Sequence, residues 1–283
     1  MECAIKAITF MQGNTKAKPN EDYLLALPDH PICAVADGVS RSRINGNYPE
    51  LSSACAAEQF CNTITAALVQ PDHSFFSSFL VANVAIAELN YSYGITRETV
   101  DYLHNDYLTC VGIAGRFSNN YPRRFEYGYI GDCGMLVYDA NCVPKFLLEN
   151  RVDILEQFRE EWGFEDEKEK YISWRYMLRN NPNAPYMTYG ALTGEISALH
   201  YLKTGYVDLV PGDTLILFSD GIYPFIFHRG FRGKVIAALK DDEDGSSVRS
   251  SLGACIVAMI PELDSKCVKN LDDDKTFIAL HID

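Results

Sequence analysis

The sequence predicts a single α+β domain in which strands form two sheets and helices pack outside them. Short apolar runs bounded by turn residues occur near the start, middle and end of the chain, as strands of a globular protein do. Long segments with a helical spacing of apolar residues stand between these runs. No internal repeat or low-complexity linker divides the 283 residues, so we expect one domain over 1–283.

The first part of the chain is expected to form strands and then two helices. Strands are predicted at 5–10, 23–27 and 32–36, and their close succession favours an antiparallel sheet. Apolar residues then recur at helical intervals, which predicts helices at 50–69 and 75–91. These helices are expected to cover one face of the first sheet.

The middle of the chain returns to strands. Residues 97–105 are expected to be a short helical connection, and strands are predicted at 108–117, 124–130, 135–138 and 143–148. Helical spacing over 152–162 and 167–178 is followed by a proline-containing break. We interpret the region around 150–200 as a flap-like insertion beside the site.

The last part of the chain is expected to alternate between strands and helices. Strands are predicted at 206–210, 214–219 and 276–282, and helices at 231–240 and 246–259.

Composition and charge exclude several classes of protein. The chain has 38 acidic and 25 basic residues, a formal net charge of −13, and sequence-independent nucleic-acid binding needs a basic surface instead. The nine cysteines include no CxxC pair, so neither a zinc ribbon nor a disulfide framework is indicated. No apolar run approaches the length of a membrane span, and no secretory signal is recognised, so we expect a cytoplasmic protein that binds no membrane.

Aspartates recur at the ends of the predicted strands. Asp37 and Asp220 each follow an apolar run and precede a glycine, Asp132 follows Gly131 after another strand, and an acidic run precedes the last strand. Each Asp-Gly could be a turn and nothing more. Several carboxylates at strand ends are nevertheless the ligands that Mg²⁺ and Mn²⁺ prefer, and glycine lets a backbone oxygen approach closely.

These motifs resemble one known family in their order and spacing. They are Asn20-Glu21-Asp22, Ala36-Asp37-Gly38, Gly131-Asp132, Ser219-Asp220-Gly221 and Asp273-Asp274-Lys275-Thr276. Together they are similar to the metal-dependent protein serine/threonine phosphatases of the PPM, or type 2C, family, and in particular to its bacterial members. The resemblance implies a four-layer α-β-β-α sandwich with two central, mostly antiparallel sheets and a cleft that binds two or three Mn²⁺ or Mg²⁺ ions.

The resemblance also implies roles for individual residues. Asp37 matches the carboxylate that bridges two metals, and Gly38 the residue that supplies a backbone carbonyl. Asp220 and Asp273 match further metal ligands, and Asp132 matches a ligand of a weaker third metal. Asp37 and Asp220 are the expected catalytic residues, acting through a metal-bound water that attacks phosphoserine or phosphothreonine in line.

Glu21 and Asp22 match acidic residues that hold metal-bound waters. The substrate implied by the resemblance is a phosphorylated protein, in signalling that opposes a serine/threonine kinase.

The sequence departs from the family pattern at several positions. Val39-Ser40 follow the first Asp-Gly, where the family often has histidine or methionine and then glycine. The arginine that commonly binds phosphate is absent; Lys18 and Arg41 are our candidates to replace it, with Lys16 and Arg43 as alternatives. The acidic run leaves the ligand open among Asp272, Asp273 and Asp274, and Asp273 is chosen because it stands three residues before Thr276.

A second hypothesis is a non-catalytic protein with this fold that binds phosphorylated partners or regulators. The missing arginine favours it. Retention of the main aspartates argues against it, because clustered carboxylates repel one another and have little structural use without cations.

Overall fold

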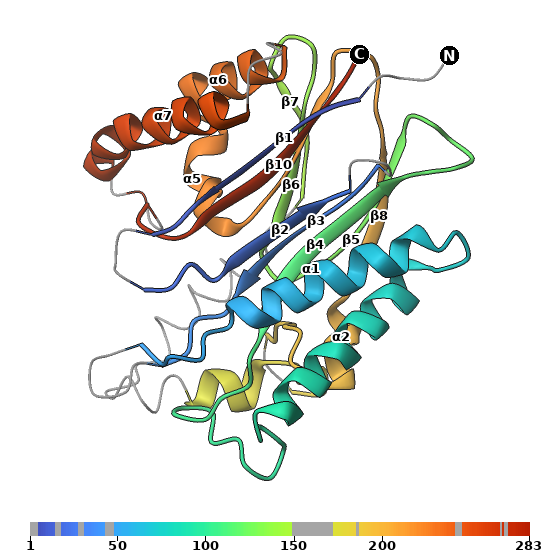
Figure 1. The fold of residues 1–283 in the computed structure, drawn as a ribbon, viewed down its shortest axis with the longest axis vertical. Coiled ribbons are helices and arrows are strands. Elements are labelled where there is room, and N and C mark those ends of the chain that lie inside the picture. Colours follow the sequence, from blue (N-terminus) through green and yellow to red (C-terminus); the bar gives the residue numbers. More distant parts are fainter. Residues whose placement is uncertain are drawn as a thin grey trace.

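The computed structural model describes residues 5–14, 18–27, 31–42, 48–148, 172–184, 187–240, 245–266, 268 and 271–283. Two five-stranded sheets stack face to face, and helices cover the outer face of each (Figure 1). This is the expected α-β-β-α arrangement. All strand pairs within the two sheets are antiparallel.

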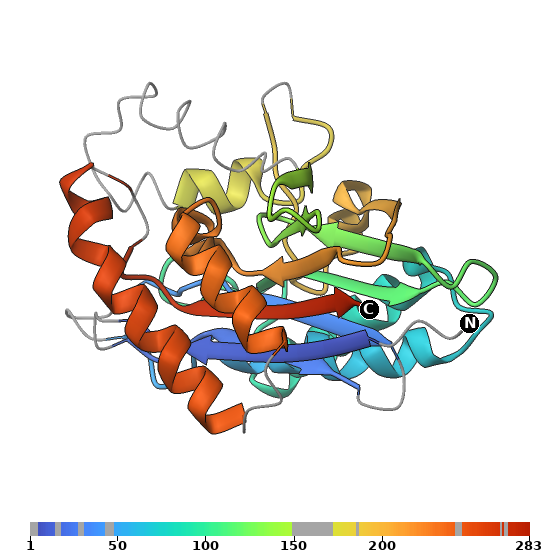
Figure 2. The same ribbon diagram turned by 90° about the horizontal axis from the view of Figure 1, so that it is seen from above.

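The first sheet joins the two ends of the chain. Its strand order is β1-β10-β9-β6-β7. The strands are β1 (Ile5–Gln12), β6 (Gly134–Tyr138), β7 (Pro144–Leu147), β9 (Thr214–Phe218) and β10 (Lys275–Ile282). The first and last strands therefore lie side by side, as Figure 2 shows from above.

The second sheet has the order β2-β3-β4-β5-β8. Its strands are β2 (Asp22–Ala26), β3 (Ile32–Gly38), β4 (Cys110–Phe117), β5 (Arg124–Ile130) and β8 (Lys203–Asp208). Strands β3 and β4 are almost entirely buried, whereas β8 alternates between exposed and half-buried residues at the edge.

Helices form the two outer layers. The second sheet is covered by α1 (Ala54–Val69) and α2 (Phe75–Ser92), and the first by α5 (Tyr223–Ile226), α6 (Arg229–Lys240) and α7 (Gly245–Ser265) (Figure 1). Ser74 caps α2 by accepting a hydrogen bond from the backbone N–H of Ser77, which satisfies one of the free donors at a helix start. Short helical turns lie at η1 (Trp174–Leu178, a π-helix), η2 (Ile196–Tyr201) and η3 (Asp220–Ile222).

The buried hydrophobic residues form three clusters, one at each contact between layers. One lies between α1, α2 and the second sheet, and another between the first sheet and α5–α7. The third lies between the sheets, with fully buried Val35, Ile113, Met135 and Leu217. Truncating Ile113, Met135 or Leu217 to alanine is expected to cost about 2–5 kcal/mol.

Most of the predicted elements are present with shifted ends, and one prediction was wrong. Residues 97–105 form turns and bends instead of a helix. The carboxylate of Asp101 accepts hydrogen bonds from the backbone N–H groups of Leu103, His104 and Asn105, which offers the chain an alternative to helical bonding. The short helix η2 was not predicted.

Two further differences have simple causes. The strand predicted at 206–210 lies at 203–208, because it pairs with residues 124–129 of β5 and has little hydrophobic alternation of its own. The helix predicted over 152–162, and most of the one over 167–178, lie outside the described residues.

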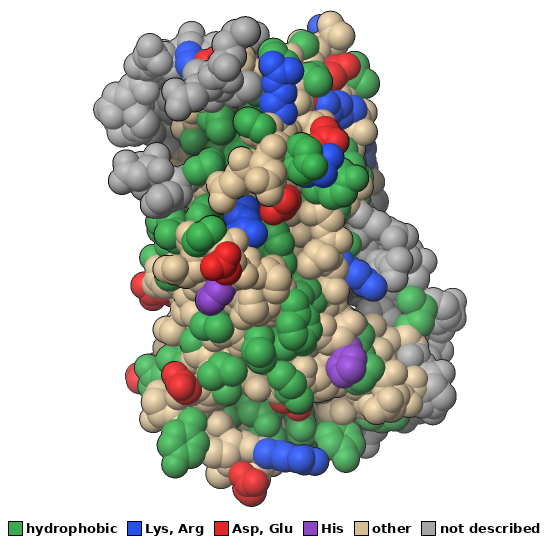
Figure 3. Space-filling model, turned by 90° about the vertical axis from the view of Figure 1, so that its right-hand side faces the viewer, with side chains coloured by type: hydrophobic (Ala, Val, Ile, Leu, Met, Phe, Trp, Pro, Cys, Tyr) green, Lys and Arg blue, Asp and Glu red, His purple; other side chains and the backbone are tan. Residues whose placement is uncertain are grey.

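The described surface is mixed in character. On the face seen in Figure 3, lysine and arginine side chains are scattered among acidic and hydrophobic ones. Of the helices in the described ranges, none combines the length and the apolar character needed to cross a membrane.

Candidate metal centre

Four strands bring carboxylates to one end of the two stacked sheets. Asp37, near the end of β3, pairs directly across from Asp22 at the start of β2. Asp220 follows β9, and Asp273 precedes β10, which is the antiparallel neighbour of β9. Because neighbouring antiparallel strands run in opposite directions, the end of one and the start of the next meet at the same edge.

Asp132 follows β5 and approaches the same residues. Its charge contributes to raising the pKa of both Asp37 and Asp220. We use the name acidic cluster for five residues: Asp22, Asp37, Asp132, Asp220 and Asp273.

The two sheets are joined here by side-chain hydrogen bonds. The hydroxyl of Ser219, after β9, donates to Oδ2 of Asp22 over 2.6 Å. Oδ1 of Asp22 is buried and makes no hydrogen bond of normal geometry within the described part of the chain, although the Thr276 hydroxyl is close enough to lower the pKa of this carboxyl. Burial outweighs these effects and raises the pKa of Asp22 to about 7.

Burial and mutual repulsion disfavour the ionised form of carboxylates in the acidic cluster. Burial, followed by the charges of Asp22 and Asp220, raises the pKa of Asp37 well above its usual value. Burial, followed by the charges of Asp132 and Asp273, does the same for Asp220, with a hydrogen bond to Asp37 as a smaller opposing effect. Like charges that share a partly dry site disfavour ionisation, and a bound cation would reverse this.

Glycines let the backbone approach closely beside two of the aspartates. A Cβ added to Gly38 would lie 2.7 Å from the carbonyl oxygens of Glu21 and Ser53. A Cβ added to Gly221 would lie 1.9 Å from the carbonyl oxygen of Asp274. Both distances are far below van der Waals contact, so the two Asp-Gly sequences are required by packing at this edge.

Glu21 is buried next to the acidic cluster and is tied to the loop that follows Asp37. Its Oε2 accepts a hydrogen bond of 2.5 Å from the Ser40 hydroxyl, and its Oε1 accepts one of 3.1 Å from the backbone N–H of Ser53. Burial raises the pKa of Glu21, although both hydrogen bonds oppose this effect.

The acidic run before β10 divides into residues with different surroundings. Buried Asp274 accepts hydrogen bonds from the backbone and side chain of Asn14 and from the backbone N–H of Glu21, so it fixes two loops. Asp273 is more exposed, and its charge raises the pKa of both Asp37 and Asp220. This difference favours Asp273 over Asp274 as a ligand.

Lys18 lies against the same carboxylates. Its ammonium is 2.9 Å from Oδ1 of Asp273, 3.4 Å from Oδ2 of Asp274 and 3.9 Å from Oε2 of Glu21. Burial alone would lower the pKa of Lys18, but the charges of Asp273 and its neighbours outweigh it and raise the pKa above the usual value.

Arg41 lies in the loop that follows Asp37 and Gly38, and its guanidinium donates to two backbone carbonyls. Its Nη1 donates to the carbonyl of Leu51 and its Nη2 to that of His104. Both expected phosphate ligands, Lys18 and Arg41, thus have protein partners already.

The carboxylates of the acidic cluster match a divalent cation in chemistry more than in their present arrangement. Among the described residues, no three His, Cys, Asp or Glu side chains are arranged as a metal-binding group. The chemistry of the donors fits nonetheless: they are carboxylate oxygens, which hard cations prefer, and they include the orphaned buried Oδ1 of Asp22. A cation bound among these carboxylates would replace their mutual repulsion by attraction.

Sequence reasoning missed several contacts around the site. Ser40 and Ser219 bind Glu21 and Asp22, and Arg175 donates to the carbonyl of Ser40. The serines adjoin the Asp-Gly motifs, which was a usable signal. Nothing in the sequence indicated the partner of Arg175.

Comparisons with known proteins show the fold. No protein-family model matches the sequence, and no curated protein matches it. Solved structures match over nearly the whole chain: PppA, a regulatory component of the type VI secretion system of Pseudomonas aeruginosa, has a TM-score of 0.60 at 14% identity and covers 99% of this chain and 98% of its own.

Two mycobacterial phosphatases are similar as well. The catalytic domain of the serine/threonine phosphatase PstP, in complex with two manganese ions, has a TM-score of 0.57 at 16% identity, with 99% of each chain covered. The PPM phosphatase MsPP of Mycobacterium smegmatis, in complex with cacodylate, has a TM-score of 0.55 at 18% identity, with 98% of each chain covered. The chain therefore has the fold of the PPM-type serine/threonine phosphatases.

Proposed function

We propose that this protein is a metal-dependent protein serine/threonine phosphatase that uses Mn²⁺ or Mg²⁺. The observation that supports the proposal is the acidic cluster, five carboxylates from both sheets at one edge of a phosphatase fold, in which burial and neighbouring charges raise the pKa of Asp22, Asp37 and Asp220. Such a cluster is costly to bury without cations, so its presence favours a metal centre over a set of turns.

The residues of the acidic cluster would hold the cations. Asp37, with the backbone carbonyl of Gly38, stands at the end of β3 and is opposed by Asp220 and Asp273 from the other sheet, while Asp132 approaches from β5. When bound, two cations supply an activated water as nucleophile and neutralise charge on the phosphoryl group. Glu21 and Asp22 lie where they could accept hydrogen bonds from water in the site.

Lys18 is a better candidate than Arg41 for binding the phosphate of a substrate. The Lys18 ammonium lies 2.9 Å from the Asp273 carboxylate of the acidic cluster, and it keeps its positive charge. Once cations neutralise the aspartates, the ammonium is available to a phosphate oxygen as a charge-assisted donor. Arg41 is bonded to two carbonyls and would have to release them.

Hydrolysis of a phosphothreonine peptide and of p-nitrophenyl phosphate tests the proposal. We expect turnover with Mn²⁺ or Mg²⁺, no turnover in EDTA, and a loss of at least about a hundredfold in Asp37→Asn and Asp220→Asn, since each removes a charged ligand. Asp72→Asn, on the exposed turn between α1 and α2, is the matched control and should remain fully active. Activity that persists in EDTA would exclude the mechanism.

One observation favours the alternative of a non-catalytic protein that binds phosphorylated partners or regulators. Lys18 already compensates part of the negative charge, so the site has some stability without a metal. Titration with Mn²⁺ in a calorimeter separates the two: binding together with turnover supports the phosphatase, and the absence of both supports the alternative.

A further inference from the structure

Two buried arginines, one within η1 and one directly after it, share a single carboxylate. Arg179, the residue that follows η1, donates to Oδ1 and Oδ2 of Asp106 over 2.7 and 3.0 Å. Arg175, within η1, places its Nε 3.2 Å from Oδ2 of the same residue. All three side chains are at most 5% exposed. We call these three residues the Asp106 network.

Within the Asp106 network, two guanidinium groups more than compensate the charge of the one carboxylate. Burial alone would raise the pKa of Asp106, but the charge and hydrogen bonds of Arg179, together with the charge of Arg175, hold it below the usual value. Both terminal nitrogens of Arg179 bind this carboxylate, whereas Arg175 meets it through Nε and directs its terminal nitrogens elsewhere.

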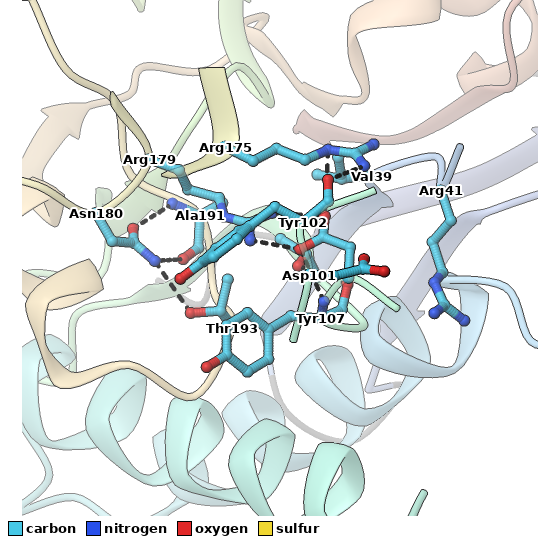
Figure 4. Close-up of polar contacts among 12 residues, drawn as sticks. Val39, Arg41, Asp101, Tyr102, Tyr107, Arg175, Arg179, Asn180, Ala191 and Thr193 are labelled. Atoms are coloured by element: carbon cyan, nitrogen blue, oxygen red, sulfur yellow. Dashed lines mark hydrogen bonds and ion pairs between the residues drawn. The ribbon is translucent and has the colours of Figure 1, made fainter. Parts of the chain in front are cut away.

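Those nitrogens bind the loop that follows Asp37 and Gly38. Arg175 donates from Nη2 to the carbonyl of Ser40 over 3.0 Å and from Nη1 to the hydroxyl of Ser42 over 3.1 Å. Nη1 also donates to the carbonyl of Tyr102 over 3.0 Å, and Figure 4 shows Arg175 extending past Tyr102 toward Val39. Tyr102 has φ +61°, a strained conformation for a bulky residue, so this contact helps to keep it in place.

The loop leads directly to the acidic cluster. The Ser40 hydroxyl donates to Glu21 and accepts from the ammonium of Lys18 at 3.3 Å. The backbone N–H of Gly38 donates to the carbonyl of Glu21, and that of Val39 donates to the carbonyl of Thr109. Residues 39–42 are therefore bound at one end to the carboxylates and at the other end to Arg175.

We propose that Arg175 is a positioning residue for the acidic cluster. By fixing residues 39–42 it holds Glu21 and the end of β3 in place, and so sets the position of Asp37 and Gly38. The part of this inference that concerns cation binding rests on the proposed function. An arginine is needed because one planar guanidinium reaches four acceptors in two segments, 40–42 and 102–106, which the single ammonium of lysine cannot do.

Amide hydrogen exchange of the full-length protein in EDTA tests the positioning role directly. In Arg175→Met we expect the amides of Gly38 and Val39 to exchange at least tenfold faster, while that of Ile278 in β10 is unchanged. Arg175→Lys keeps a charge beside Asp106 and should show the same local effect with the fold retained. Arg123→Met, an exposed arginine at the β4–β5 turn, is the control and should match the wild type.

The result that overturns the proposal is equally specific. Unchanged exchange at Gly38 and Val39, or an equal acceleration at Ile278, would reduce Arg175 to a general stabilising residue.

A Mn²⁺ titration of the same variants tests the connection to the site. We expect Arg175→Met to bind Mn²⁺ at least tenfold more weakly than the wild type and Arg123→Met to bind it equally well. Equal affinity in the wild type and Arg175→Met overturns the inference. A wild type that binds no Mn²⁺ overturns the proposed function and the cation-binding part of the inference, and the exchange data alone then decide whether Arg175 positions the loop.

Discussion

Replacing Asp106 by asparagine should destabilise the protein far more than the same change at an exposed ion pair. Asp106→Asn preserves size but leaves the guanidinium groups of Arg175 and Arg179 buried without their carboxylate. Removing one partner of a buried pair costs about 3–5 kcal/mol, and we expect the upper end because two arginines lose their counter-charge. For 283 residues, with an unfolding entropy of about 2.1 cal/mol/K per residue, 5 kcal/mol lowers Tm by about 8 °C.

The chain provides a matched control. Asp208 pairs with Arg124 at 2.8 and 3.1 Å, in a bidentate contact through Nε and Nη2, but this carboxylate is exposed. Solvent screens such a pair, so Asp208→Asn should leave Tm unchanged within error. Thermal unfolding followed by circular dichroism measures both variants, and equal shifts for the two would refute the reasoning.

The pH dependence adds a second check on Asp106. Its pKa in the folded protein is lowered, so its contribution is complete above the unfolded pKa of about 3.9 and is lost as the pH falls through the folded value. The difference in Tm between the wild type and Asp106→Asn should therefore shrink below about pH 4. A constant difference down to pH 3 would mean that packing, and not charge, explains the loss.

Two other predictions follow from the site. Gly221→Ala would place a Cβ 1.9 Å from the Asp274 carbonyl oxygen and should lower the free energy of unfolding by about 3 kcal/mol or more. Gly233→Ala adds a Cβ that meets nothing within 4 Å in helix α6, so it should raise the free energy of unfolding by about 1 kcal/mol. Urea unfolding measures both variants. In EDTA, the raised pKa of Asp22 means that its stabilising contribution is present below about pH 4 and is lost as the pH rises to about 7. Asp22→Asn should therefore flatten the pH dependence of Tm over that range. An unchanged profile would contradict the raised pKa of Asp22.

The acidic edge could be predicted from sequence because local patterns specify it. An apolar run followed by Asp-Gly, as at Asp37 and Asp220, predicts a buried strand and its end, and antiparallel pairing then brings such ends together. The choice among the three aspartates before β10 could not be made from the local sequence. It depends on Asn14, whose backbone and side chain occupy Asp274 from 260 residues away.

The Asp106 network could not be predicted for a related reason. Arg175 and Arg179 are four residues apart, a spacing that places two side chains on one helical face. Their carboxylate is 73 residues before Arg179, directly after the segment 97–105, whose expected helix does not form because Asp101 binds the local backbone instead. Sequence periodicity contains no information about a pairing of this kind.

The departure from the family pattern after Asp37 has a physical consequence in this protein. The family often has glycine where Ser40 stands, and glycine could not donate a hydrogen bond to the buried Glu21. The Ser40 hydroxyl does so at 2.5 Å, while the Ser40 carbonyl accepts from Arg175. A serine at this position therefore adds a direct side-chain contact with Glu21 to the backbone hydrogen bond from Gly38 to Glu21, so the segment that Arg175 binds is held to this residue twice.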